Sequence, residues 1–336
     1  MARRRILPIF IPHLGCPNEC VFCDQRRISG SPLPASGAEV TEALERAKSQ
    51  GLRGLELAFY GGSFTAIAPA EQEELLGAAQ PFYDDGTIVS IRLSTRPDVI
   101  DAAVIERLRR HRVSTVELGA QSMVDEVLYA SGRGHTAGDT ETAARLLKAA
   151  GFSLILQMMT GLPGADTERD AETARRIIAL GPDGVRIYPT VIVEGTELCR
   201  MWRAGTYREH TVEEAVETCA AILPLFEAAG IPVIRLGLNP TEELSGGSAV
   251  GGAYHPALGE LVRSELMRRK AAELLRDVPA GASVTLGVAR GRTSAMTGQH
   301  RRNIALLTEA FSLSGLRIAE VPEAEDGDIL VVDWIL

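Results

Sequence analysis

ILPIFIPHLGCPNECVFC, residues 6–23, joins a short apolar run to three closely spaced cysteines. The apolar run, Ile6–Ile11, predicts a buried β-strand. Cys16, Cys20 and Cys23 follow it in a C-x3-C-x2-C spacing. In barrels of parallel strands the functional residues lie on the loops that leave the carboxyl ends of the strands. The segment therefore predicts a first strand that leads directly into a cysteine-rich functional loop.

The first two thirds of the chain continue this alternation of strand and helix. Apolar or β-branched runs predict strands at 6–11, 54–60, 87–95, 114–120, 152–159, 185–193 and, more weakly, 231–238. Helical periodicity separates them at 38–49, 69–80, 99–110, 137–150, 167–180 and 212–229. Such alternation predicts a parallel sheet with right-handed crossovers. Six to seven units of this kind form an incomplete or complete α/β barrel.

Residues after about 240 differ in character. Residues 241–256, TEELSGGSAVGGAYHP, are rich in Gly and Ser and predict a loop or linker. A basic helix is expected over 257–277, followed by a strand at 283–288, a helix at 300–312 and strands at 316–321 and 329–334. We therefore expect a barrel over residues 1–240, and a linker, a basic helix and a small α+β domain over residues 241–336.

The composition is that of a globular protein with an acidic balance. The 336 residues are 45% hydrophobic and 24% charged, and the formal net charge is −9. This charge excludes a generally basic nucleic-acid coat. Residues 256–302 nevertheless contain nine Arg or Lys against four Asp or Glu. This local excess suggests a phosphate-bearing substrate such as RNA, although a solvated helix face explains it equally well.

Apolar runs and cysteine usage predict a cytoplasmic protein without a membrane segment. No window approaches the roughly 18 consecutive apolar residues of a membrane helix. Pro8 and Pro12 interrupt the amino-terminal apolar run, which we interpret as a strand and not as a signal peptide. Five cysteines are too few for a disulfide framework, and Cys199 and Cys219 fall in expected helices, where core thiols are common.

The cysteine triplet has the composition of an iron–sulfur site. Thiolates ligate such clusters, and Cys16, Cys20 and Cys23 are close enough in sequence to hold one 4Fe–4S cluster from a single loop. Three ligands leave the fourth iron without a protein ligand, so a substrate can bind there. The alternative is a structural zinc site, which takes four protein ligands and could recruit His13 as the fourth.

The triplet, with an aromatic residue before its last cysteine, resembles the signature of the radical S-adenosylmethionine (SAM) enzymes. Further motifs follow in the order of that superfamily: YGGSF at 60–64, TRPD at 95–98, ELGAQS at 117–122, RGHT at 133–136, GLPG at 161–164, YPT at 188–190 and GTEL at 195–198. Over about residues 5–240 the set resembles the radical SAM domain of the Elongator catalytic subunit, a tRNA wobble-uridine modifying enzyme. It resembles oxygen-independent coproporphyrinogen oxidases more loosely.

The resemblance implies a partial (β/α)6 radical SAM barrel and a set of site residues. Cys16, Cys20 and Cys23 would hold one 4Fe–4S cluster, as metal ligands and catalytic residues, and its open iron would chelate SAM. One electron then cleaves SAM to a 5′-deoxyadenosyl radical, which abstracts a hydrogen atom from the substrate. The candidate cofactor-binding residues are Phe22, Gly61, Gly62, Ser63, Ser94, Gln121, Arg133 and Gln157. Ser94 departs from relatives, which often have Glu there. Each polar member could instead satisfy loop backbone, and Phe22 could belong to the core.

The resemblance also implies partners and a function. We expect SAM and a low-potential electron donor of the flavodoxin or ferredoxin type, with tRNA as the favoured substrate. The alternatives are a radical SAM enzyme for a small metabolite or tetrapyrrole, and a non-catalytic metal-binding protein. The Elongator subunit spaces its cluster cysteines more widely and carries an acetyltransferase domain. The residues after Val278 are too few for one, so we do not expect the full Elongator reaction.

Overall fold

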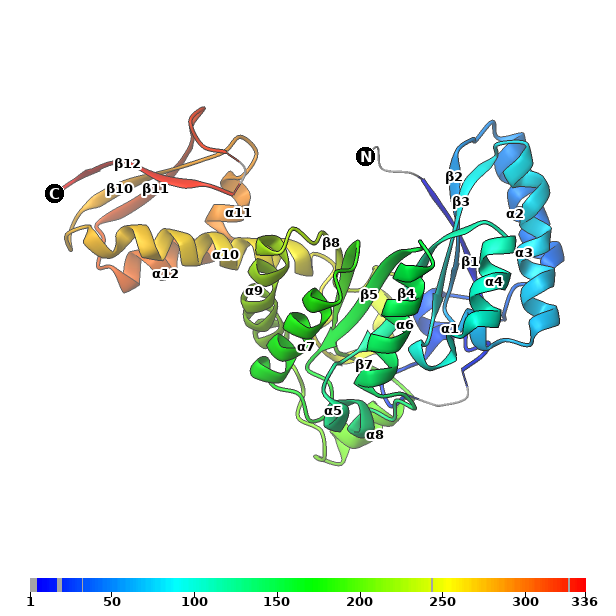
Figure 1. Ribbon diagram of the computed structural model, residues 1–336. Helices are drawn as coiled ribbons and strands as arrows, with labels where there is room; N and C mark the ends of the chain where they lie inside the picture. Colours follow the sequence, from blue (N-terminus) through cyan, green and yellow to red (C-terminus); the bar gives the residue numbers. More distant parts are fainter. Residues whose placement is uncertain (1–4, 17–19, 32, 243, 326) are drawn as a thin grey trace. The chain divides into compact units, whose positions relative to one another are not determined.

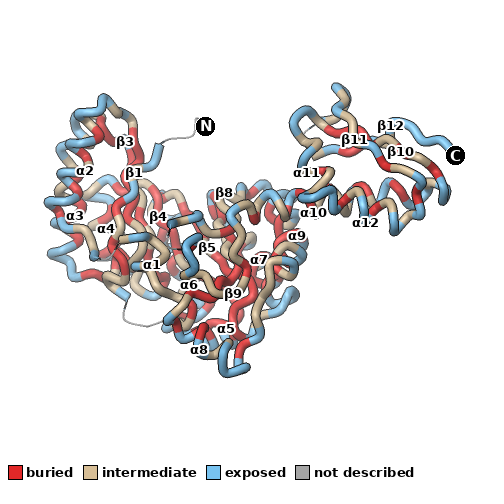
Figure 2. Tube along the Cα trace, turned by 180° about the vertical axis from the view of Figure 1, so that it is seen from behind, coloured by how far each residue is buried: buried red, intermediate tan, exposed pale blue. Residues whose placement is uncertain are grey.

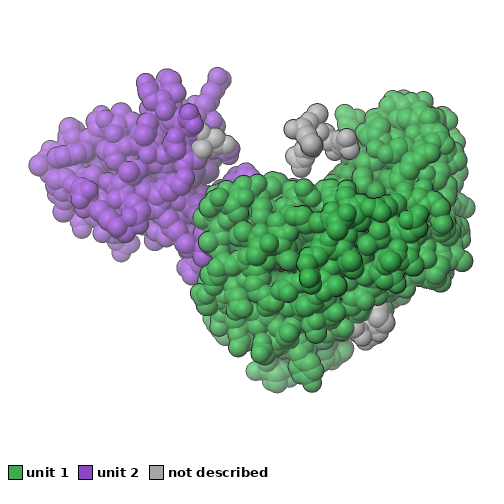
Figure 3. Space-filling view, in the orientation of Figure 1, with its two compact units in different colours: residues 1–211, 222–254 green, residues 212–221, 255–336 purple. Residues whose placement is uncertain are grey.

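The computed structural model describes residues 5–16, 20–31, 33–242, 244–325 and 327–336. Contacts between its residues divide the chain into two units (Figure 3). Unit 1 comprises Met1–Thr211 and Ile222–Tyr254, and unit 2 comprises Val212–Ala221 and His255–Leu336. No helix among the described residues is long and apolar enough to cross a membrane.

A parallel sheet forms the centre of unit 1 (Figure 1). Within the described residues it has seven strands, in the order β1 (Ile6–Phe10), β2 (Leu55–Tyr60), β3 (Ile88–Thr95), β4 (Val113–Gln121), β5 (Ser153–Thr160), β6 (Gly184–Pro189) and β8 (Val233–Leu236). Every neighbouring pair is parallel. The partial barrel expected from the sequence is confirmed, and the weakly predicted seventh strand belongs to it.

The sheet is curled. In a flat sheet β2 and β6 would lie four strand spacings apart, about 19 Å. Yet Nη2 of Arg186 on β6 donates a hydrogen bond of 3.2 Å to the hydroxyl of Tyr60 on β2. Side chains stand roughly perpendicular to a sheet, so these two meet only because the sheet bends round them. The curl creates a lumen lined by the inward-facing residues of the strands.

Helices connect the strands of unit 1. The longer ones are α2 (Gly37–Ser49), α3 (Pro69–Asp84), α4 (Ala102–Arg110), α6 (Ala137–Ala149), α7 (Thr167–Ala179) and α9 (Val212–Ala228), whose first part belongs to unit 2. Short helices are α1 (Gln25–Ser29), α5 (Asp125–Ala130) and α8 (Glu197–Arg203). Capping boxes at Ser36 and Thr136 satisfy the first amides of α2 and α6.

The core of unit 1 lies between the strands and these helices (Figure 2). The strands are apolar and buried on both faces over much of their length, as parallel sheets covered by helices are. Phe59 on β2 is fully buried, and so is Phe64 in the loop that follows, with ring centroids 4.9 Å apart. The core therefore holds the carboxyl end of β2 rigidly where the site begins.

Two expectations about unit 1 are wrong. The expected strand at 185–193 is divided, because Pro189 has no amide hydrogen to continue the ladder. Beyond it β7 (Val191–Val193) pairs antiparallel with β9 (Ala249–Gly252), inside the segment expected to be a loop. A Cβ on Gly252 would lie 2.6 Å from the carbonyl oxygen of Thr190. The glycines there thus allow close strand packing and do not mark only a linker.

Unit 2 is a small α+β fold, as expected. Its elements are α10 (Leu258–Leu274), β10 (Ser283–Val288), α11 (Thr293–Thr297), α12 (Arg302–Ala310), β11 (Gly315–Glu320) and β12 (Ile329–Ile335). The sheet order is β11-β10-β12, with β10 parallel to β11 and antiparallel to β12. Apolar side chains of α10, α11 and α12 pack with the sheet into a separate core. The helix expected at 300–312 begins only at Arg302, and α11 was not expected.

Candidate functional site

The cysteine loop leaves β1 and packs backbone against backbone on the end of β2. Ile11 N–H donates to the carbonyl oxygen of Tyr60 at 2.8 Å, and Ser63 N–H donates to that of Leu14 at 2.8 Å. A Cβ on Gly62 would lie 2.5 Å from the carbonyl oxygen of Ile11 and 2.6 Å from that of Leu14. Gly62 is therefore required by the approach of the cysteine loop itself.

The second half of the loop is held by unit 1 from the other side. Val21 N–H donates to the carbonyl oxygen of Ser131 at 3.1 Å, and Leu198 N–H donates to that of Val21 at 2.7 Å. Phe22 is buried in an apolar cluster that includes Leu198 and Cys199. The ring of His13 accepts the N–H of Gln25 through Nε2 at 3.0 Å. His13 thus closes the loop, a structural use of the residue that the zinc alternative needs.

One cavity of about 950 Å³ opens beside this loop. It is large enough for a drug-sized cofactor or more, since ligand pockets span roughly 300–1,000 Å³. All of the site residues expected from the sequence line it: Cys16, Cys20, Phe22, Cys23, Gly61, Gly62, Ser63, Ser94, Gln121, Arg133 and Gln157. These residues come from the ends of β1 to β5 and the loops after them, so the fold gathers them from a span of more than a hundred residues.

The three thiols share the cavity and repel one another as thiolates. Burial, and then the neighbouring Cys20 thiol, raise the pKa of Cys23 to about 12. Gln25 Nε2 donates to the Cys23 sulfur at 3.4 Å. In the described part of the chain no three His, Cys, Asp or Glu side chains are already arranged as a metal-ion site. Three crowded, soft thiol donors nevertheless match the ligands that iron–sulfur clusters take.

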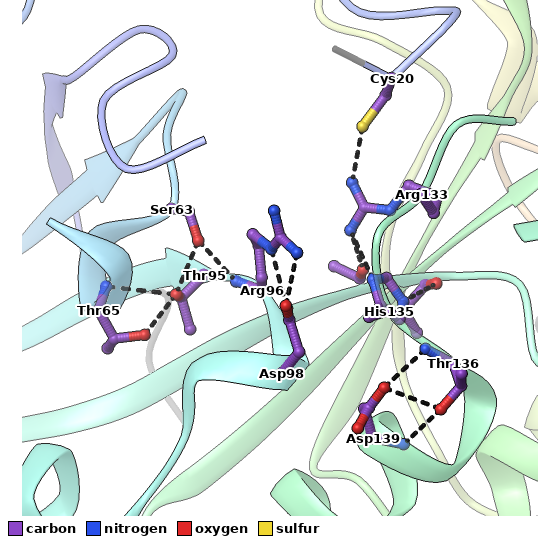
Figure 4. Close-up of polar contacts among 12 residues, drawn as sticks. Cys20, Ser63, Thr65, Thr95, Arg96, Asp98, Arg133, His135, Thr136 and Asp139 are labelled. Carbon is purple, nitrogen blue, oxygen red and sulfur yellow. Dashed lines mark hydrogen bonds and ion pairs between the residues drawn. The ribbon is translucent and has the colours of Figure 1, made fainter. Parts of the chain in front are cut away.

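Arg133 connects the cysteine loop to the end of β4 (Figure 4). Its Nη1 lies 3.2 Å from the sulfur of Cys20, and its Nη2 donates to the carbonyl oxygen of Gly119 at 2.8 Å. Burial, and then Arg133, lower the pKa of His135 to about 4. The imidazole is therefore neutral at pH 7, its Nε2 lies 3.1 Å from the carbonyl oxygen of Ala120, and Nδ1 faces Arg133 Nη2 at 3.4 Å. The neutral imidazole therefore adds no second positive charge beside Arg133 at the cavity wall.

Gln121 and Gln157 form an amide pair in the wall of the cavity. Gln157 Nε2 donates to Gln121 Oε1 at 3.2 Å. Gln121 is buried and has φ +64°, a left-handed backbone conformation that a side-chain-bearing residue adopts at a cost. Such outliers cluster at ligand sites. The strained backbone presents the Gln121 side chain where the ladder between β4 and β5 slips by one residue.

A hydroxyl cluster joins the ends of β2 and β3 (Figure 4). Ser63 Oγ lies 3.2 Å from Thr95 Oγ1 and accepts the N–H of Arg96 at 3.1 Å. Arg96 in turn donates from Nε to Asp98 Oδ1 at 2.8 Å. Ser63 is 1% exposed, so its hydroxyl is used to hold the loop. The Arg96 guanidinium is a second positive charge on the cavity wall.

An ion network fills the lumen below the loop. Glu117 on β4 is 2% exposed and accepts from Arg92 Nη1 at 2.8 Å and from Arg186 Nη2 at 2.9 Å. Arg92 Nη2 also lies 3.0 Å from Glu56 Oε2. Burial, and then Glu117, raise the pKa of Tyr60, so its hydroxyl stays protonated. Glu117, Arg186, Tyr60 and Tyr188 also line the cavity, so this network forms part of its wall.

Sequence reasoning missed Arg96 and the lumen network as parts of the site. Arg96 belongs to the TRPD motif at 95–98, directly after a predicted strand, and this position at the carboxyl end of a strand could have indicated a site residue. The network residues alternate with apolar residues near the ends of the predicted strands, for example Tyr188 two residues after Arg186. That alternation marks one face of a strand but does not say whether the face is the lumen or the helix layer.

Comparison with known protein families agrees with this geometry. The radical SAM superfamily matches residues 10–177, which is half of the chain, and the radical SAM C-terminal domain matches residues 182–268. Residues 10–177 contain the cysteine loop, β2 to β5 and all eleven expected site residues.

Individual relatives point the same way. The tRNA uridine(34) acetyltransferase of Methanocaldococcus jannaschii is 39% identical over 132 residues, which cover 38% of this chain and 24% of that protein. Elongator complex protein 3 of Mus musculus is 33% identical over 140 residues, 41% of this chain and 26% of that protein. The match thus spans about a quarter of these relatives.

A solved structure extends the likeness beyond those segments. The archaeal Methanocaldococcus infernus Elp3 with an N-terminal deletion superimposes with a TM-score of 0.62 at 25% identity, over 79% of this chain and 63% of that chain. The resemblance to the Elongator-type radical SAM region is therefore confirmed in both sequence and fold. The chain belongs to the radical SAM superfamily.

Proposed function

We propose that this radical SAM enzyme holds a 4Fe–4S cluster on Cys16, Cys20 and Cys23, cleaves SAM in the adjoining cavity, and acts on tRNA. The observation that carries the proposal is the cavity of about 950 Å³, which has the three thiols and two arginines, Arg96 and Arg133, in its wall. When bound, the cluster would supply one electron that cleaves SAM into methionine and a 5′-deoxyadenosyl radical. A low-potential donor of the flavodoxin or ferredoxin type would supply that electron.

The chain's own residues suit the parts of SAM. The Arg133 guanidinium is charged and partly buried, so it can pair with the carboxylate of the methionine moiety. The Gln121–Gln157 amide pair offers a donor and an acceptor to the ribose hydroxyls. Phe22 lies both in the apolar cluster and in the cavity wall, where it can stack on the adenine. Gly61 and Gly62 line the cavity at the end of β2, where their backbone can contact the ligand.

The lumen network would support the same reaction by limiting the access of water to the cavity. Glu117 pairs with both Arg92 and Arg186 across the lumen, so the three side chains occupy space that bulk water would otherwise fill. A radical intermediate requires such exclusion, because water and oxygen quench it in side reactions. The tRNA assignment rests on the relatives, whose names are tRNA uridine(34) acetyltransferase and Elongator complex protein 3.

The cluster and SAM chemistry are tested on protein reconstituted under strict anaerobiosis. Iron and sulfide contents of about four each per chain, and release of 5′-deoxyadenosine with dithionite and SAM, are the expected results. A zinc-loaded protein that releases no 5′-deoxyadenosine would overturn the assignment. It would favour the non-catalytic metal-binding alternative.

The tRNA assignment needs a separate experiment. Nucleosides from the tRNA of a strain that lacks the protein are compared with those of its parent by mass spectrometry, with a strain carrying Cys20→Ala as the matched control. Loss of one modified nucleoside in both mutant strains is expected. Identical nucleoside profiles, together with an accumulated small metabolite, would replace tRNA by the small-molecule alternative.

A further inference from the structure

Unit 2 contains a tight turn between two short helices on one side of its sheet (Figure 1). The chain runs from β10 through α11, the turn Gly298–Arg301 and α12 to β11, and β10 and β11 are parallel neighbours. We call these four residues, Gly-Gln-His-Arg, the GQHR turn. KH domains carry a four-residue loop of the type G-x-x-G, which clamps the backbone of about four nucleotides. The GQHR turn has the first of those two glycines.

The backbone of the GQHR turn departs from ordinary helix geometry. Gly298 has φ +75° and ψ 162°, a region open almost only to glycine, and a Cβ there would lie 3.0 Å from Asn303 Cγ. His300 and Arg301 have φ +50° and +60°. Arg301 therefore adopts the left-handed conformation that a second glycine would take more easily. Strain of this kind persists only where the surrounding structure imposes it.

Asn303 imposes that conformation. Its side chain is buried and donates from Nδ2 to the carbonyl oxygen of Ser264 at 2.9 Å and to that of Met296 at 3.1 Å. These bonds fasten the start of α12 to α10 and to the end of α11. The turn is thus ordered without a ligand, which lowers the entropic cost of binding one.

Positive charge gathers around the turn, and the nearby carboxylate of Glu320 accepts the N–H of Gly291 at 2.8 Å. Residues 278–308 contain four arginines, at positions 290, 292, 301 and 302, together with His300, and no Asp or Glu. Arg290, Arg301 and Arg302 are exposed, and their side chains form no ion pair or hydrogen bond with any residue the structure describes. The start of α12 has no side-chain cap and no acid in its first turn, which adds partial positive charge.

The arginines on α10 and directly after it pair with carboxylates. On α10 the carboxylate of Glu265 binds both Arg268 at 2.6 Å and Arg269 at 2.8 Å. Arg263 pairs with Glu260, and Arg276 pairs with Glu273. The arginines of the basic helix expected from the sequence are therefore paired, whereas Lys270 donates to the carbonyl oxygen of Gly327. The exposed arginines of unit 2 without a carboxylate partner among the described residues are Arg290, Arg301 and Arg302 near the turn, and Arg317 on β11.

We infer that the GQHR turn, with Arg290 and Arg302, is a docking surface for the phosphate backbone of a short single-stranded RNA segment. Exposed arginines without acidic partners are the groups that bind phosphates. A four-residue clamp fits a few unpaired nucleotides and not a duplex. Only the choice of RNA over DNA rests on the proposed function. The surface itself is independent of the cluster cavity and of SAM.

The test is fluorescence polarisation with a labelled single-stranded RNA of about ten nucleotides and the whole chain, over a salt series from about 50 to 200 mM. The variant Arg301→Glu/Arg302→Glu is compared with Arg263→Glu/Arg276→Glu, called the α10 variant, which makes the same change in charge at exposed positions on α10 and in the 3-10 turn directly after it. The turn variant is expected to bind at least about tenfold more weakly. The logarithm of the association constant falls as the logarithm of the salt concentration rises, and this slope should be less steep by about 1.4 for the turn variant. Each lost phosphate contact contributes about 0.7 for single strands, and the variant loses two.

The α10 variant should bind within about twofold of the wild type, because it removes no phosphate contact. Equal losses in both variants would show that only net charge matters and would overturn the inference, as would wild-type protein that binds no RNA at low salt. Equal affinity for single-stranded DNA of the same sequence would overturn the assignment to RNA.

Asn303→Ala keeps every charge but loosens the turn, so weaker binding by this variant supports the preorganised geometry, and unchanged binding opposes it. 5′-Deoxyadenosine release by the wild-type protein, measured in parallel, reports on the proposed function separately.

Discussion

Glu117 on β4 and Arg186 on β6 form a two-point ion pair across the barrel lumen. Arg186 Nε lies 2.8 Å from Glu117 Oε2, and Arg186 Nη2 lies 2.9 Å from Oε1. β5 stands between their two strands in the sheet, so the pair bridges strands that are not neighbours. Glu117 also holds Arg92 at 2.8 Å. One carboxylate thereby pairs with two buried guanidinium groups.

Glu117→Ala is expected to lower the free energy of unfolding by about 3–5 kcal/mol, because it leaves Arg92 and Arg186 buried without their shared partner. Urea unfolding followed by circular dichroism measures the change. Glu42→Ala serves as the matched control, since Glu42 pairs with Arg46 on the exposed face of α2, where such a pair contributes at most about 0.5 kcal/mol. Similar losses in the two variants would contradict the role given to the lumen network.

Replacing any one of Cys16, Cys20 and Cys23 by Ala is expected to abolish 5′-deoxyadenosine release, because two thiolates cannot anchor the cluster. Cys219→Ala is the control: Cys219 is fully buried on α9, outside the cavity, so this variant should keep its iron and its SAM cleavage. Anaerobic iron and sulfide analysis accompanies the activity measurement. A single loop variant that retains full cleavage would show that the ligands are assigned wrongly.

Arg133→Gln is expected to weaken SAM binding about 10- to 100-fold, because a charge-assisted hydrogen bond contributes about 1.5–3 kcal/mol. The dissociation constant is measured by anaerobic equilibrium dialysis of reconstituted protein. Arg109→Gln is the control, since Arg109 is exposed on α4 and donates to the carbonyl oxygen of Ala150. If iron content stays normal and SAM affinity does not change, Arg133 has only a structural role at Gly119.

Asp170 is expected to make stability depend on pH. Burial raises the pKa of this carboxyl from 3.8 to about 7. Between those values the unfolded chain releases the proton and the folded chain keeps it, so the free energy of unfolding falls as pH rises and levels off above the folded pKa. In the wild type the N–H of Gly161 donates to Asp170 Oδ2 at 3.0 Å. The variant Asp170→Asn keeps an oxygen acceptor for this N–H but cannot ionise.

From about pH 5 to about pH 8 the wild type should therefore lose about 2–3 kcal/mol relative to Asp170→Asn. Chemical denaturation of both proteins across that range measures the difference. Asp139→Asn is a useful control, because hydrogen bonds from Thr136 lower the pKa of this carboxyl, which is the opposite direction. Parallel pH profiles for wild type and Asp170→Asn would show that Asp170 is ionised in the folded protein throughout.

The alternation of strands and helices in unit 1 was predictable because each element is indicated by the pattern of apolar residues within its own short segment. Buried strands such as β2 are short continuous apolar runs, and helices such as α7 repeat their apolar residues every three to four positions. The prediction failed where a tertiary contact overrides the local pattern. Val191–Val193 leaves the main sheet after Pro189 and pairs with a glycine-rich segment that has no strand signal of its own.

The sequence by itself determined the superfamily and the succession of strands and helices along the chain, and it predicted the three cysteines as cluster ligands, because spacing and periodicity are properties of neighbouring residues. Only the tertiary structure decided which charged residues meet in the lumen. Glu117 and Arg186 are 69 positions apart and face each other because the sheet curls. Tertiary contacts also decided that Gly62 is needed for the cysteine loop. In unit 2 they separated the paired arginines of α10 from Arg290, Arg301 and Arg302, which have no partner among the described residues, because ion pairing depends on distance in space and not on distance along the chain.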